Sequence, residues 1–169
     1  MNHPQTACCF TGHRNLPKNH LYALKRALPA AIEDCLEDGC FDFYCGGAVG
    51  FDTLAADAIL HLRAQDPRIR LHLLLPHRHQ ADLFSPDDRI RYYDILSRAD
   101  TAFFLSDTAV SGNMLRRNRA LVNHSTRCIS YCTRSSGGTA YTVAYAVSRG
   151  IPVYNLAEQI SAWSIPPKR

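Results

Sequence analysis

The sequence lacks the features that mark membrane-bound or secreted proteins. Its 169 residues contain no apolar run near the roughly 20 residues that a membrane-spanning helix needs. The first residues, MNHPQTACCFTG, have neither the basic start nor the apolar stretch of a secretory signal peptide. We therefore expect a cytoplasmic protein without a membrane partner.

Cysteine pairs with metal-binding spacing are also absent. Seven cysteines occur, but no C-x-x-C pair does. An odd number of cysteines without a secretion signal indicates reduced thiols rather than a disulfide framework. Cys128 and Cys132 lie in an apolar stretch, and His77 and His79 have no cysteine nearby at zinc-ligand spacing. We expect the cysteines to pack in the core, and we expect no metal site.

Lysine is scarce, because 16 of the 19 basic residues are arginine. The net charge of +4 is too small to indicate nucleic-acid binding by itself. The excess of arginine is consistent with bidentate hydrogen bonding to anions, and it is equally consistent with a GC-rich coding sequence, so both explanations stay open. With 46% hydrophobic and 20% charged residues the chain is globular. We expect one domain over residues 1–169, with a core from about 6 to 156 and a C-terminal tail over 157–169.

Short apolar segments alternate with segments of helical spacing. We expect strands at residues 7–11, 41–45, 69–75, 101–105, 127–131 and 151–154. We expect helices at residues 21–36, 52–62, 89–98, 115–124 and 140–149, the first kinked or restarted at Pro29. This alternation is typical of an open, doubly wound α/β fold, with a mainly parallel sheet of five or six strands and helices on both faces. In such sheets ligands bind beyond the carboxyl ends of the strands, near the topological switch point.

Two glycine-rich turns stand at predicted strand ends. Residues 46–50 (GGAVG) link the second strand to the second helix, and Gly137-Gly138-Thr139 opens a later helix. Glycines permit close approach of a ligand to the backbone, and a helix N-terminus suits phosphate. The first turn is neither the dinucleotide fingerprint, which follows the first strand, nor a Walker loop, which ends in Lys-Ser/Thr. A tight turn capped by Asp52 is the structural alternative for it, but the two turns together favour a phosphate or nucleotide site.

Arginines flank both turns. Arg14 follows the first strand and either projects into the same crevice or lies on the surface and caps a neighbouring element. Three more arginines surround Asn118, at positions 116, 117 and 119. A helix cannot aim all three at one ligand. No G-x-S-x-G nucleophile turn accompanies them, so nothing supports Ser-His-Asp catalysis.

Five motifs in order resemble the YpsA-like branch of the SLOG superfamily over about residues 6–156. They are Thr11-Gly12-His13-Arg14, Gly46-Gly47-x-x-Gly50-x-Asp52-x-x-Ala55, YYDILSRAD at 92–100, Arg117-Asn118, and Gly137-Gly138-Thr139 followed by Ala146. Members have a Rossmann-like fold and bind nucleotides or nucleotide-derived ligands. The resemblance implies a pocket lined by Arg14, Gly46, Gly47, Gly50, Asp52, Arg117, Asn118, Gly137, Gly138 and Thr139. It also implies a homodimer, because SLOG relatives often self-associate.

The chain departs from its enzymatic relatives at the position of their catalytic carboxylate. Lonely Guy phosphoribohydrolases, which release a base from a nucleoside monophosphate, carry P-G-G-x-G-T-x-x-E, and Thr142 stands where the Glu should be. The YpsA-like group often has an Asp after the fifth strand, where this chain has Cys132-Thr133. An N-glycosidic cleavage needs a carboxylate. Asp52 is the one candidate that the motifs bring to the pocket.

Three functions follow as expectations. The first is a nucleotide-binding sensor or sequestering module that takes AMP, ADP-ribose or an NAD-related ligand and requires no cofactor. The alternative is a nucleotide N-glycosidic or phosphoribosyl hydrolase that uses Asp52. The second alternative, by analogy with DNA-processing protein A, is single-stranded nucleic-acid binding. It would need stacking by Tyr92 and Tyr93 beside Arg89 and Arg91, residues that fit an ordinary amphipathic helix equally well.

Overall fold

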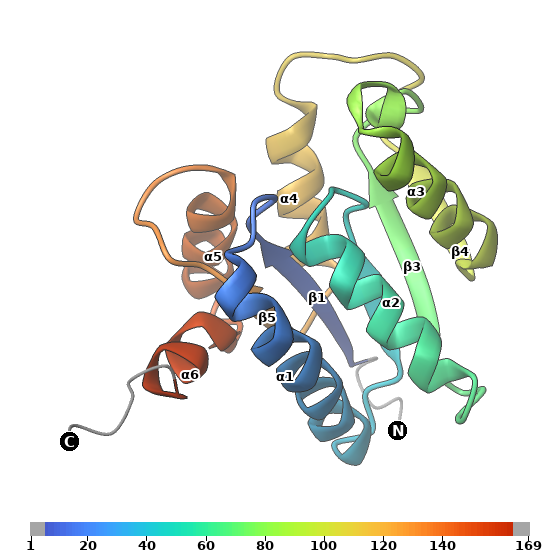
Figure 1. Cartoon of the computed structure of the whole chain (residues 1–169). Helices are drawn as coiled ribbons and strands as arrows, with labels where there is room; N and C mark the ends of the chain where they lie inside the picture. The colour runs from blue at the N-terminus through green and yellow to red at the C-terminus, as the bar shows by residue number, and fades with distance from the viewer. Residues whose placement is uncertain (1–5, 164–169) are drawn as a thin grey trace, which may run out of the picture.

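A computed structural model describes residues 6–163 of the chain and shows one sheet between two layers of helices (Figure 1). The strands are β1 (Ala7–Gly12), β2 (Asp42–Cys45), β3 (Arg70–Leu75), β4 (Thr101–Phe104), β5 (Arg127–Tyr131) and β6 (Val153–Asn155). Their order across the sheet is β4-β3-β2-β1-β5-β6, and every neighbouring pair is parallel. The predicted Rossmann-like α/β fold is confirmed.

The helices connect the strands in chain order. They are α1 (Lys18–Glu37), α2 (Phe51–Arg63), the 3-10 turn η1 (Gln80–Leu83), α3 (Pro86–Arg98), α4 (Asn113–Asn123), α5 (Gly138–Ser148) and α6 (Leu156–Trp163). The chain first steps outward from β1 to β4 and then returns past β1 to β5. Because parallel crossovers are right-handed, this reversal sends α4 and α5 to the face opposite α1, α2 and α3. The topological switch point therefore lies between β1 and β5.

Two apolar cores confirm this assignment of faces. The larger core contains side chains of α1, α2, α3 and α6, packed on Leu71, Leu73 and Leu75 of β3. The smaller core contains Leu121 and Val122 of α4 together with side chains from the other face of the strands. The alternation follows from the strand geometry, since successive side chains point to opposite faces.

The C-terminal segment corrects the expected tail over residues 157–169. Residues 156–163 form α6, and its Leu156, Ala157 and Ile160 are buried in the larger core. These three apolar positions share one helical face, which covers the sheet beside α1 (Figure 1). The core thus extends beyond residue 156, while residues 164–169 of the expected tail lie outside the described residues.

All five predicted helices begin one to three residues earlier than expected, and α1 also differs in its interior. The restart at Pro29 does not occur, because α1 is one helix and the buried residues Leu24, Leu28 and Ile32 run through that position. Helix α3 begins three residues earlier than expected, since Ser85 accepts a hydrogen bond from the Asp88 N–H at 3.2 Å and caps the helix ahead of Pro86. Within residues 6–163, no helix combines the length and the apolar character that crossing a bilayer requires.

The turn between β2 and α2 yields a stability prediction. Gly50 has a φ of +78°, and a Cβ placed there would stand 2.2 Å from the Arg14 carbonyl oxygen. Gly112 has a similar φ of +83° but nothing within 4 Å of such a Cβ. Gly112→Ala should therefore cost only the backbone strain of about 1–2 kcal/mol. Gly50→Ala should lower the free energy of unfolding by about 1–3 kcal/mol more, because backbone atoms must move. Urea titrations followed by circular dichroism measure the free energy of unfolding of both variants. Equal losses of stability in Gly50→Ala and Gly112→Ala would contradict the packing argument.

Candidate functional site

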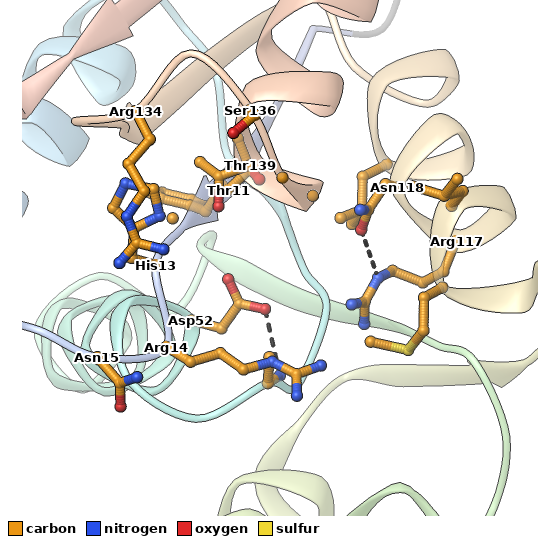
Figure 2. A pocket seen from close by; sticks show the side chains of 18 residues that line it. Thr11, His13, Arg14, Asn15, Asp52, Arg117, Asn118, Arg134, Ser136 and Thr139 are labelled. Carbon is orange, nitrogen blue, oxygen red and sulfur yellow. Dashed lines mark hydrogen bonds between the residues drawn. The ribbon is translucent and has the colours of Figure 1, made fainter.

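A cavity of about 400 Å³ opens at the carboxyl ends of β1 and β5. Its walls come from the end of β1 and the loop after it, the first turn of α2, the helix α4, and the loop from β5 into α5 (Figure 2). This is the switch point at which the following helices diverge to opposite faces, and it is the usual ligand position in an open α/β sheet.

The start of α5 forms one wall of the cavity. Gly137 precedes the helix with a φ of +96°, and no side chain caps the helix there. The first N–H groups of a helix have no acceptor inside it, and they carry the positive end of the helix dipole. Gly137, Gly138 and Thr139 all line the cavity. This wall therefore suits an anionic group such as a phosphate.

Arg117 is held rigidly in the wall formed by α4. Only 4% of this residue is exposed. Its Nη1 donates to the Gly46 carbonyl, and its Nε donates to Asn118 Oδ1 at 2.9 Å. Burial lowers the pKa of Arg117, and the Asp52 carboxylate opposes this effect. The guanidinium thus joins α4 to the end of β2 and still borders the cavity.

Asp52 is the buried carboxyl of the site, with 6% exposure in the first turn of α2. Burial raises its pKa, while Arg117, the Ala48 N–H and Arg14 act in the opposite direction. The hydrogen bond from the Ala48 N–H to Asp52 Oδ2 measures 3.2 Å and is drawn as a dashed line in Figure 2. Asp52 therefore organises the glycine turn as well as facing the cavity.

The glycines of the first turn lie behind the cavity wall, whereas sequence reasoning placed them against the ligand. None of the three lines the cavity. A Cβ on any of them would collide with protein atoms, namely Arg117 for Gly46, Leu75 for Gly47, and the Arg14 carbonyl for Gly50. The nearby N–H groups are also used internally, since Phe51 donates to the His13 carbonyl at 3.1 Å. In this structure these glycines make room for Arg117, for Leu75 and for the β1–α1 loop.

The other predicted site residues do come together. Arg14, Asp52, Arg117, Asn118, Gly137, Gly138 and Thr139 all line the cavity. Figure 2 shows the side chains of Arg14, Asp52 and Arg117 converging on one space. Arg14 differs from Arg117 in being exposed, so its guanidinium is free to meet a ligand at the rim.

Sequence reasoning missed several further lining residues. These are His13, Asn15, Met114, Leu115, Arg134 and Ser136. Arg134 and Ser136 lie within the three residues before Gly137, so the argument that selected the second glycine turn could have been extended to them. His13 stands inside the quoted T-G-H-R motif. Arg134 is exposed at the opening and adds a third cation to the site.

His13 connects the two loops that diverge at the switch point. Its Nε2 accepts a hydrogen bond from the Thr133 N–H at 2.9 Å, which requires the neutral ring with its proton on Nδ1. The ring packs edge-on against Tyr131, with 5.8 Å between ring centres. Burial lowers the pKa of His13, and the positive charge of Arg134 lowers it further. The neutral imidazole thus fixes the position of the β5–α5 loop.

Two other predicted features lie apart from the cavity lining. Thr142 is fully buried in α5 and donates to the Gly138 carbonyl at 2.8 Å, so no carboxylate occupies the Lonely Guy position. On α3, Tyr92 is buried against Phe84, and Arg91 forms an ion pair with Asp57. These contacts occupy residues that a stacking platform for single-stranded nucleic acid would need.

Within residues 6–163 no group of His, Cys, Asp or Glu side chains is placed to hold a metal ion.

Comparison with known families agrees with the ordered motifs. The sequence model of the YspA SLOG family (YpsA) matches residues 8–152, from β1 to the residue before β6. The chain belongs to the YspA SLOG family. The resemblance drawn from the five motifs is therefore confirmed, and the cavity described above is the candidate ligand site of this YpsA-type SLOG protein.

Its relatives include proteins of varied description. The chain is 27% identical over 136 residues to the uncharacterized SPbeta prophage-derived protein YoqJ of Bacillus subtilis (strain 168), which covers 73% of this chain and 80% of YoqJ. It superposes on DNA processing protein A from Helicobacter pylori with a TM-score of 0.62 and 16% identity, over 88% of this chain and 64% of that one. For the protein TM1055 the TM-score is 0.57 and the identity 17%, over 93% and 81% of the two chains. The chain thus spans less than two thirds of DNA processing protein A, and both structural likenesses show the fold alone.

The neutral state of His13 predicts a pH dependence of stability. Because the pKa of His13 is lowered in the folded protein, the unfolded chain binds the proton more readily below its ordinary pKa of 6.5. This contribution to stability is present above pH 6.5 and is lost as the pH falls through the folded-state pKa. His13→Gln keeps an acceptor for the Thr133 N–H but does not titrate, so its melting temperature should fall less between pH 7.5 and pH 5.5 than that of the wild type.

A matched variant for this experiment is His61→Gln, which changes an exposed histidine of α2. Its melting temperature should fall with pH as steeply as that of the wild type. If the melting temperature of His13→Gln falls with pH as steeply as that of the wild type, His13 is not the titrating group.

Proposed function

We propose that this SLOG protein binds a nucleotide or nucleotide-derived anion and acts as a sensor or sequestering module in the cytoplasm. The observation that supports this most directly is the meeting of the uncapped start of α5 with three arginines around one cavity. Arg14, Arg117 and Arg134 outnumber the single carboxylate of Asp52 there. An excess of positive charge at an open helix N-terminus selects for phosphate.

The remaining lining matches the other parts of a nucleotide. Asn15, Asn118 and Ser136 offer polar groups suited to ribose hydroxyls, while Met114 and Leu115 offer apolar surface for a base. A volume of about 400 Å³ lies toward the lower end of the range of small-molecule sites. We therefore place AMP ahead of ADP-ribose and NAD-related compounds as the first ligand to test.

A thermal-shift panel tests the proposal with AMP, ADP, ADP-ribose, NAD, adenosine and inorganic phosphate. A ligand at about 100 times its Kd adds about 2.7 kcal/mol to the free energy of unfolding. For a domain of this size that raises the melting temperature by roughly 5–10 °C. We expect a shift with AMP or a related nucleotide and a much smaller one with adenosine, which lacks the phosphate. A flat panel on protein shown to be free of copurified ligand would refute the proposal.

Arg14 supplies the sharpest single substitution. We expect Arg14→Ala to weaken binding of the ligand found in the panel by about 1.5–3 kcal/mol, the scale of a charged hydrogen bond. That loss corresponds to a roughly 10- to 150-fold higher Kd in calorimetric titrations. Arg149→Ala, which removes an exposed arginine after α5 and outside the cavity lining, is the control. Unchanged affinity in Arg14→Ala would remove Arg14 from the site.

The buried carboxyl of Asp52 favours a second candidate function, the N-glycosidic hydrolysis of a bound nucleotide. A desolvated carboxyl with a raised pKa at a cavity wall is a common feature of acid–base sites. In this mechanism Asp52 would activate water or stabilise positive charge on the ribose. Chromatography of nucleotide mixtures should then show free base, and Asp52→Asn should abolish its release while binding persists. If no nucleotide releases free base, hydrolysis is refuted and ligand binding is the remaining function.

Single-stranded nucleic acid is the third candidate ligand, suggested by the likeness in fold to DNA processing protein A, which binds single-stranded DNA in Helicobacter pylori. The internal contacts of Tyr92 and Arg91 weigh against it. It would require oligonucleotide binding with a steep dependence on salt concentration.

A further inference from the structure

Three polar side chains form a chain of hydrogen bonds across neighbouring strands at the amino ends of the sheet. Thr101 is the first residue of β4, His72 is the third of β3, and Asp42 is the first of β2. Thr101 lies opposite His72 in the register of the parallel pair. None of the three lines the ligand cavity, which opens at the carboxyl ends of the strands. They therefore form a separate site, whose chemistry does not depend on the nucleotide binding proposed above.

Asp42 anchors this chain of hydrogen bonds. Only 5% of the residue is exposed, and it accepts from Arg70 through both oxygens, Oδ1 from Nε at 2.9 Å and Oδ2 from Nη2 at 3.0 Å. A bidentate contact of this kind binds the ionised carboxylate and fixes its orientation. Asp42 Oδ1 also lies 2.7 Å from His72 Nε2. Because an ionised carboxylate only accepts hydrogen bonds, the proton of the neutral His72 ring sits on Nε2.

His72 is thereby oriented as a base toward Thr101. Its ring is stacked on Tyr44, with 4.8 Å between ring centres and 28° between the planes, and Tyr44 is stacked in turn on His124 at the end of α4. With the proton on Nε2, the Nδ1 atom of the neutral ring is an acceptor. Nδ1 lies 2.7 Å from Thr101 Oγ1. The Thr101 hydroxyl therefore donates to a base whose position is fixed by a carboxylate and by stacking.

Thr101 itself is exposed on the surface of the sheet. Alternate residues of a strand share one face, so Phe103 lies on the same side of β4, and it is 62% exposed. This surface suits a short apolar acyl group beside the hydroxyl. A hydroxyl, a base within hydrogen-bond distance and a third group that orients the base are the arrangement that activates serine and threonine nucleophiles. No local motif marks it, because the successive members lie 29 and 30 positions apart in the chain.

We propose that Thr101 is a nucleophilic hydroxyl that takes an acyl group from an activated ester or thioester. The Thr101 oxygen attacks the carbonyl carbon, and the hydroxyl proton passes to His72 Nδ1. The new C–O bond remains, the bond from that carbon to the leaving oxygen or sulfur breaks, and the leaving group departs with the proton from His72 as an alcohol or a thiol. Nothing is oxidised or reduced, and His72 is neutral again. Asp42 is a positioning residue in this step, because it acts through His72.

Acetylation by p-nitrophenyl acetate tests the nucleophile. Trypsin cleavage after Arg98 and Arg116 releases one peptide that holds both Thr101 and Thr108, an exposed threonine of the loop after β4 that serves as the internal control. Tandem mass spectrometry at increasing reaction times gives the acetylation rate of each. We expect Thr101 to react about 100-fold faster than Thr108, the scale of general base catalysis. Thr101→Ser should keep the acetyl group at this position. Equal rates at the two threonines, in protein whose circular dichroism shows it folded, would refute the proposal.

His72→Gln tests the base. It removes the proton acceptor and should slow acetylation of Thr101 by about 100-fold. His61→Gln changes an exposed histidine of α2 and is the matched control, in which the rate should not change. If Thr101 is acetylated as fast in folded His72→Gln as in the wild type, His72 is not the base and the proposal fails.

The tautomer of His72 tests the positioning by Asp42. Two-bond ¹H–¹⁵N spectra of the histidine rings distinguish a ring protonated on Nε2 from one protonated on Nδ1. We expect the proton on Nε2 in the wild type. Asp42→Asn can donate to Nε2 through its amide, so the proton should move to Nδ1 in part of the molecules, and acetylation of Thr101 should slow. A neutral wild-type ring protonated on Nδ1 would overturn the proposal.

Discussion

The electrostatic interaction between Asp52 and Arg117 joins the two helical layers at the end of the sheet where the ligand cavity opens. Each residue is more than nine-tenths buried, and the charge of each offsets part of the energetic cost of desolvating the other. Asp52 stands on α2 and Arg117 on α4, which cover opposite faces of the sheet. The residue between them, Gly46, has no side chain because the Arg117 guanidinium occupies that space. Removal of either charge would leave the other buried without its partner.

This internal pair divides the cations of the site into two kinds. Arg117 is fixed by its bonds to Gly46 and Asn118, whereas Arg14 and Arg134 stand exposed at the opening. A fixed cation sets the electrostatic potential of the cavity at little entropic cost, and exposed ones lose freedom only when a ligand orders them. The neutral ring of His13 completes the frame because it ties the β5–α5 loop to the end of β1.

The two ends of the parallel sheet carry different chemistry for a structural reason. At the carboxyl ends, loops and helix N-termini meet and present N–H groups to an anion. At the amino ends, the last turn of α1 returns beneath the sheet, where Cys35 shares the larger core with Cys8 and borders a small cavity together with Arg127. A whole strand length separates the two ends, and neither of these cysteines lines the ligand cavity.

Local patterns in the sequence determined the alternation of strands and helices, the position of the second glycine turn, and Arg14 at the end of the first strand, because each depends on residues within one or two helical turns. Tertiary structure alone decided that Gly46 accommodates Arg117, that Arg134 and His13 share a wall, and that α6 closes the core. It also decided that Cys8 and Cys35 share one core. These outcomes depend on strand order, which brings together residues that lie 27 to 121 positions apart in the chain. Periodicity records which face of an element is apolar, and it carries no information about which distant element covers that face.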